Sequence, residues 1–210
     1  MKIRIILYTM ASLFLLASCK KNETDVANTS SLSFQVQTQN QGTGLVQWSS
    51  GTAHAASITA ITPSATESNY NSIVSQDMNL FSASGIGSLN LPLGDYQNTQ
   101  FRIELSPSGN GSSLHLEGIF NDGTSMVPVI FDISDIAILQ VLSSNFNIAA
   151  GSTYKVSVAV DLTALTQGIV ADDLMNEELN GQVLLSSQSN AATYNTIVSN
   201  LASSLSVTVQ

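Results

Sequence analysis

Charged residues and cysteine are scarce in this 210-residue chain. Only 10% of the residues are charged, and 6 Lys or Arg stand against 15 Asp or Glu, giving a formal net charge of −9. Such an acidic chain lacks the basic surface that nucleic acid or an anionic membrane surface requires, so we expect neither as a partner. The single cysteine excludes an intrachain disulfide and a site built from several thiolates.

Motifs that bind cofactors or carry out catalysis are also missing. The sequence has two histidines and no HExxH or HxH spacing, which argues against zinc. It has no Gly-x-Ser-x-Gly elbow, no Gly-x-Gly-x-x-Gly loop and no Walker-type loop. We therefore expect no cofactor.

Sugar-binding platforms usually hold several aromatic residues, whereas Trp48 is the only tryptophan here. We interpret Trp48 as a core residue.

The N-terminus has the pattern of an export signal. Lys2 and Arg4 precede an apolar segment over residues 5–16, which is too short to span a bilayer as a helix. The motif "LASC" that follows resembles the bacterial lipobox, and this resemblance implies cleavage after residue 18 and acylation of Cys19. The alternative is an ordinary secretory signal with a chance cysteine. Residues 19–31 are polar and short in side chain, which predicts a flexible tether.

Residues 32–210 are predicted to form one domain. The stretches "LPLGDYQNTQFRIEL" and "FNIAAGSTYKVSVAVDL" resemble uncharacterised β-sandwich lipoproteins of Bacteroidetes. That resemblance implies a lipid-anchored protein of the outer membrane, facing the periplasm or the cell surface, and implies no activity.

Apolar and polar residues alternate along the domain, as in half-buried strands. Residues 101–105 and 114–120 are predicted to pair, which places Glu104 opposite His115 and Arg102 opposite Glu117. A tight hairpin at Asp122-Gly123 then leads into residues 127–133. Its symmetric register places Leu114 opposite Phe131, Leu116 opposite Val129 and Gly118 opposite Val127. Pro128 predicts an edge or a bulge in that strand.

Further strands and two helices follow from the same periodicities. Residues 172–179 and 190–205 are predicted to be helical, and the fold class is mainly β: an antiparallel β-sandwich, immunoglobulin-like or transthyretin-like, with one or two short helices near the C-terminus. The other predicted strands cover residues 31–37, 45–48, 56–61, 78–81, 88–91, 136–142, 154–162, 182–186 and 206–209.

Each titratable cluster has a structural and a functional interpretation. We interpret His115 and Glu117 as members of cross-strand ion pairs, the alternative being a general base with its partner. His54 is interpreted as a loop or strand-end residue. Asp132 and Asp135 are either a carboxylate pair or the polar end of a strand.

The densest acidic group is the only candidate metal site. Asp172, Asp173, Glu177 and Glu178 offer oxygen ligands suited to calcium, but their spacing lacks the pattern of an EF-hand loop. We interpret them as capping and solvating a helix.

These observations favour a membrane-anchored, exported lipoprotein with a non-catalytic binding or envelope-structural role. Its protein or glycan partner is unknown. A fimbrial or assembly subunit is the alternative, and an enzyme, which would have to be a carboxylate-based glycoside hydrolase, comes third.

Overall fold

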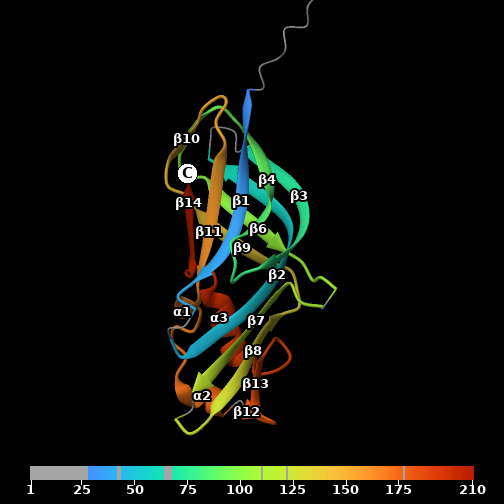
Figure 1. The fold of residues 1–210 in the computed structure, drawn as a ribbon, viewed down its shortest axis with the longest axis vertical. Helices are drawn as coiled ribbons and strands as arrows, with labels where there is room; N and C mark the ends of the chain where they lie inside the picture. The colour runs from blue at the N-terminus through green and yellow to red at the C-terminus, as the bar shows by residue number, and fades with distance from the viewer. Residues whose placement is uncertain (1–27, 42–43, 64–67, 110, 122, 177) are drawn as a thin grey trace, which may run out of the picture.

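The structure, a computed structural model, describes residues 28–41, 44–63, 68–109, 111–121, 123–176 and 178–210. It is mainly β with short helices near the C-terminus, as expected (Figure 1). The signal segment, Cys19 and most of the tether lie outside the described residues. The elements are β1 (Thr29–Gln39), β2 (Val46–Thr62), β3 (Ser68–Asn79), β4 (Ser84–Pro92), β5 (Gly94–Tyr96), β6 (Gln100–Leu105), β7 (Leu114–Asn121), β8 (Met126–Ile133), β9 (Ala137–Leu142), β10 (Phe146–Ile148), β11 (Tyr154–Asp161), α1 (Leu162–Leu165), α2 (Ala171–Met175), β12 (Glu178–Leu179), β13 (Gln182–Leu185), α3 (Ala191–Asn200) and β14 (Leu205–Val209).

The strands form two main sheets and a small two-stranded one. The four-stranded sheet has the order β14-β11-β1-β4, and the larger sheet has the order β12-β13-β8-β7-β2-β6-β9 with β3 also paired to β2. The small sheet joins β5 and β10. Because β1 runs parallel to β11 and β13 runs parallel to β8, the sheets are mixed, and the prediction of a purely antiparallel fold is wrong.

Strand β2 spans 17 residues and connects the two ends of the elongated molecule (Figure 1). Its first half pairs with β7 and its second half with β6, so β6 and β7 lie end to end along one edge of β2. Strand β3 pairs along the opposite edge. The β2 ladders carry bulges next to Ser49 and Ala56, where β-bulges bend a strand.

The core lies between the buried faces of the two main sheets. On β1 every second residue is buried, and the ring of Phe34 meets Phe101 of β6 edge to face, with 5.3 Å between ring centroids. Trp48 is 3% exposed, which confirms its predicted place in the core. Burial of such aromatic and branched side chains provides most of the driving force for folding.

The predicted pairing of residues 101–105 with 114–120 is wrong, because β2 pairs with both segments. Glu104 lies opposite Ser57 and Ile138, while Arg102 and Glu104 approach each other along one strand at 3.7 Å. The β7–β8 hairpin does form, but its first pair is Asn121 with Met126.

The longer turn shifts the predicted β7–β8 register by two residues and leaves the inward faces unchanged. Leu116 therefore pairs with Phe131, and Gly118 with Val129. Strand β8 is not an edge strand, although its ladder with β13 begins at Val129, just after Pro128. Pro128 itself pairs only along the β7 edge, opposite Ile119, so its missing N–H donor falls outside the β8–β13 ladder.

Two of the C-terminal helices match the predicted segments in part. The segment over 172–179 is helical only to Met175 and continues as β12. In α3, Tyr194 and Ile197 are buried, and the Tyr194 ring packs on Phe131 with 5.6 Å between centroids. None of the helices in the described part of the chain has the length and apolar character needed to span a bilayer.

Candidate functional site: a pocket beside two histidine–carboxylate pairs

Both histidines lie on the outer face of the larger sheet, near its junction with the loop between β6 and β7. The alternation of β2 buries Gly51, Ala53 and Ala55 and leaves Thr52 and His54 on the outer face. The backbone of His54 holds both ends of the loop: Ser106 N donates to its carbonyl oxygen at 3.1 Å, and its own N–H donates to Ser113 O at 3.1 Å. The bend of β2 therefore positions the loop beside this face.

His54 pairs with a carboxylate on the neighbouring strand. Its Nδ1 lies 2.7 Å from Asp77 Oδ1, and its Nε2 lies 3.5 Å from Ser75 Oγ. The prediction that His54 is a loop or strand-end residue is wrong, because His54 lies in the middle of β2. Asp77 is 23 residues away in sequence and belongs to β3, whose first ten residues were not predicted to form a strand.

The contacts of His54 match those of a serine hydrolase triad, with Ser75 as the nucleophile, His54 as the base and Asp77 as the acid. Ser75 also has a left-handed backbone conformation (φ 53°). Two features weaken this arrangement. The Asp77 side chain is 80% exposed, so water competes for the carboxylate that has to orient the imidazole. Ser75 is also not among the residues that line the neighbouring pocket.

His115 lies between two carboxylates. Its Nδ1 is 2.7 Å from Asp132 Oδ1 and its Nε2 is 3.2 Å from Glu117 Oε1. Serine hydroxyls hold both acids, since Ser50 Oγ donates to Glu117 at 2.7 Å and Ser112 Oγ donates to Asp132 at 2.9 Å. The cross-strand role predicted for His115 is confirmed, but its partner on the next strand is Asp132 rather than Glu104.

The electrostatics of this group favour the charged pair. Burial opposes protonation of His115, but hydrogen bonds and charge from Asp132 and Glu117 outweigh it and raise the His115 pKa. The Ser50 hydroxyl, and then His115, lower the pKa of Glu117. Because both ring nitrogens face carboxylates, His115 is poorly placed to take a proton from a substrate.

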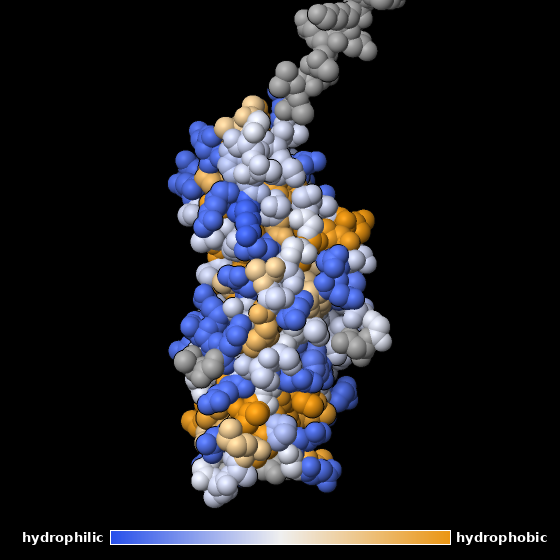
Figure 2. All heavy atoms as spheres, in the orientation of Figure 1, coloured by the Kyte–Doolittle hydropathy of each residue, from blue (hydrophilic) through white to orange (hydrophobic). Residues whose placement is uncertain are grey.

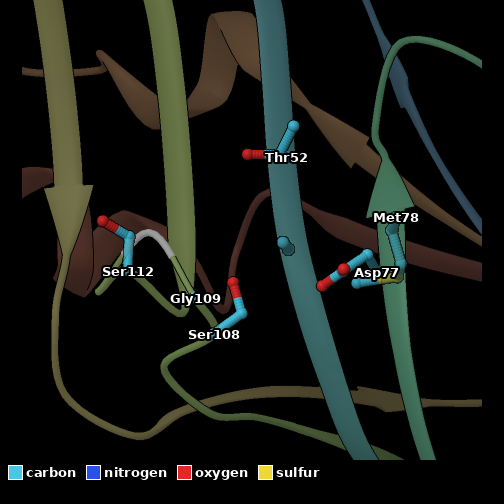
Figure 3. Close-up of a pocket in the computed structure, with 7 residues that line it drawn as sticks. Thr52, Asp77, Met78, Ser108, Gly109 and Ser112 are labelled. Carbon is cyan, nitrogen blue, oxygen red and sulfur yellow. The ribbon is translucent and has the colours of Figure 1, made fainter.

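A pocket of about 320 Å³ is lined by Asp77 of one pair and by Ser112, whose hydroxyl donates to Asp132 of the other pair (Figure 3). Thr52 and Asp77 come from adjacent strands, and Ser108 and Ser112 come from the loop that faces them. Figure 3 shows the side-chain oxygens of Thr52 and Ser108 directed into the space between β2 and the loop, while the Asp77 carboxylate points from β3 toward β2. The pocket therefore offers hydroxyls and one carboxylate to a ligand.

The other predicted acidic groups do not converge. Asp172 and Asp173 are exposed in the first turn of α2, where Asp173 accepts a hydrogen bond from Val170 N at 3.0 Å. Glu177 and the side chain of Glu178 lie outside what the structure describes. Among the residues it does describe, no three His, Cys, Asp or Glu side chains are grouped to hold a metal ion.

Asp132 and Asp135 are not joined as a carboxylate pair. Asp132 binds His115 and Ser112, whereas the backbone carbonyl of Asp135 accepts a hydrogen bond from Ser113 Oγ at 2.6 Å.

Comparisons of the chain with models of known protein families, with curated proteins and with solved structures gave no match. The inference about function therefore rests on the geometry of these side chains.

Proposed function

We propose that this protein is an exported lipoprotein, anchored in the outer membrane by lipid on Cys19, with a non-catalytic binding role. Its domain is best described as a β-sandwich, because Phe34 and Phe101 join the buried faces of the two main sheets. The tether ahead of β1 would display this domain in the periplasm or at the cell surface.

The single observation that carries the binding role is the pocket beside the histidine–carboxylate pairs. Its oxygens accept hydrogen bonds, Asp77 carries a negative charge, and the chain as a whole is strongly acidic. These features suit a ligand that donates hydrogen bonds and bears a positive charge, such as a lysine side chain of a partner protein.

Titration calorimetry with pentalysine at low ionic strength tests this proposal. We expect measurable binding that Asp77→Asn weakens about tenfold, the loss of one charge-assisted contact. Asp172→Asn is the matched control, because it removes the same charge from the exposed first turn of α2. Equal weakening by the two variants would show that the attraction is non-specific, and would refute the proposal that pentalysine binds in this pocket.

The contacts of His54 with Ser75 and Asp77 support a second candidate function, which is acyl transfer by the Ser75 hydroxyl. A fluorophosphonate probe should then label the protein, and both Ser75→Ala and His54→Gln should abolish the labelling. We expect no labelling, since the exposed Asp77 carboxylate holds His54 only weakly.

A further inference from the structure

A second pocket lies at the seam where the two main sheets approach each other. Among the strands that the structure describes, β3 pairs with β2 alone and β4 pairs with β1 alone, so β3 and β4 are not hydrogen-bonded neighbours. Each strand therefore turns an edge with backbone donors and acceptors toward the seam. A pocket of about 340 Å³ opens there between β3 and β4.

The lining of this pocket is polar and carries no formal charge. It consists of asparagine amides, serine hydroxyls, one tyrosine and one leucine. An amide both donates and accepts hydrogen bonds, as a hydroxyl does, so the lining matches ligands whose groups do the same. The polar members and the tyrosine are Asn69, Tyr70, Asn71, Ser72, Ser88 and Asn90.

Two of the side chains are held in place by the sheets. Thr59 Oγ1 on β2 donates to Asn71 Oδ1 at 3.0 Å, which fixes that amide and leaves its nitrogen as a donor. Tyr70 is half-buried and packs against the core. Such preorganised groups lose little freedom when a ligand binds.

The seam closes beside the pocket, which limits the shape of the ligand. Gly87 of β4 has φ 144°, and a Cβ added there would lie 2.6 Å from Val74 Cγ1 of β3. The two strands are therefore in close contact at this point. An extended peptide strand cannot run the length of the seam, whereas a short ligand fits the open part between Asn69 and Ser72.

We infer that the pocket at the β3–β4 seam binds a neutral saccharide. Amides and hydroxyls would bind the sugar hydroxyls, because each of these groups can donate and accept hydrogen bonds. A charged sugar would find no compensating ion among the lining residues. The size of the pocket suits a short oligosaccharide or a chain end.

The test is calorimetry on the full chain in a detergent without a sugar headgroup. The probes are maltotetraose, cellotetraose, xylotetraose and mannotetraose, with tetragalacturonic acid as the charged comparison and a Ser/Thr/Val octapeptide as an extended strand. We expect at least one neutral tetrasaccharide to bind with a dissociation constant below about 1 mM. Tetragalacturonic acid and the octapeptide should bind at least tenfold more weakly.

Variants assign the binding to this pocket. Asn71→Ala and Asn90→Ala should each weaken saccharide binding about fivefold to tenfold, while Asn195→Ala, an exposed amide on α3, should leave it unchanged. Unchanged melting temperatures would show that the variants are folded. No binding by any neutral probe, tighter binding of the charged sugar or the octapeptide, or binding that survives the Asn71→Ala, Asn90→Ala double variant would each overturn the inference. Asp77→Asn should not affect saccharide binding, because Asp77 does not line the β3–β4 pocket. The saccharide test and the pentalysine test can therefore fail independently of each other.

Discussion

Gly118 occupies a position on β7 that has no room for a side chain. A Cβ added there would lie 2.8 Å from the backbone oxygen of Gln47 and 2.9 Å from Val46 Cγ1. We expect Gly118→Ala to destabilise the protein by roughly 1–3 kcal/mol through overpacking. Urea denaturation measures the change. Gly109→Ala is the control, because nothing lies within 4 Å of its added Cβ, and equal losses in both variants would contradict the explanation.

The His115 group should make stability depend on pH. Its pKa is raised in the folded state above the ordinary value of 6.5, so its stabilising contribution is complete below that value and is lost as pH rises through the folded-state pKa. We expect His115→Gln to cost about 0.5–1 kcal/mol near pH 5.5 and clearly less near pH 8.5. Chemical denaturation at the two pH values gives both differences. The same cost at both would show that protonation is not the cause.

Sequence patterns placed His115 correctly but did not identify its partner or the residues that line the pocket. Alternation placed His115 on the outer face, yet its partner on the next strand depended on the length of the β7–β8 turn, which is two residues longer than the Asp-Gly signal predicts. His54 and Asp77 meet across a ladder between distant segments, and a period-two pattern carries no information about which strands pair. The convergence of the pocket residues could therefore not be predicted.

At the scale of elements, helix α3 is anchored by one side of its surface. Ile197 is 1% exposed, while the adjacent Val198 is 37% exposed. We expect Ile197→Ala to lower the free energy of unfolding by about 2–4 kcal/mol and Val198→Ala by less than about 1 kcal/mol. Thermal and urea unfolding would compare the two. Similar costs would mean that the helix packs through a broader face than the structure shows.

Helix α2 should not respond to calcium. Asp173 caps the helix by accepting from Val170 N, and the exposed Asp172 adds a favourable charge at the same end. We expect the melting temperature in millimolar calcium and in chelator to agree within about 1 °C. A rise of several degrees that Asp173→Asn abolishes would instead reveal a calcium site.

Strongly alternating strands were predictable, and β3 was not. In the middle of β1 and along β11 every second residue is a large apolar one, so the positions of these strands follow from the sequence. In β3 the pattern is weak: Tyr70 and Val74 point inward with Ser72 between them, while the apolar Ile73 is 84% exposed. The position of β3 is determined by its pairing with β2. Such pairing between distant segments leaves little trace in the local sequence pattern.

At the scale of the whole molecule, the surface is mainly hydrophilic on the face shown in Figure 2, with apolar patches near the end that carries α2, β8 and β13. A domain with such a surface, if exported as we propose, would need a separate anchor to stay at a membrane. We expect Cys19→Ala to move the protein from the membrane fraction to the soluble fraction, or to leave it uncleaved, because two or three acyl chains form the proposed anchor. Detergent-phase partitioning unchanged in the variant would contradict this.

The position of β1 also has a mechanical consequence for a protein held by its N-terminus. β1 begins at Thr29 and lies inside its sheet, with β11 along one edge in eight register pairs and β4 along the other. Tension applied along the chain at Thr29 would load these ladders in shear, so many backbone hydrogen bonds would have to rupture together rather than unzip one at a time. The domain would therefore resist pulling forces best at the end by which we propose it is attached.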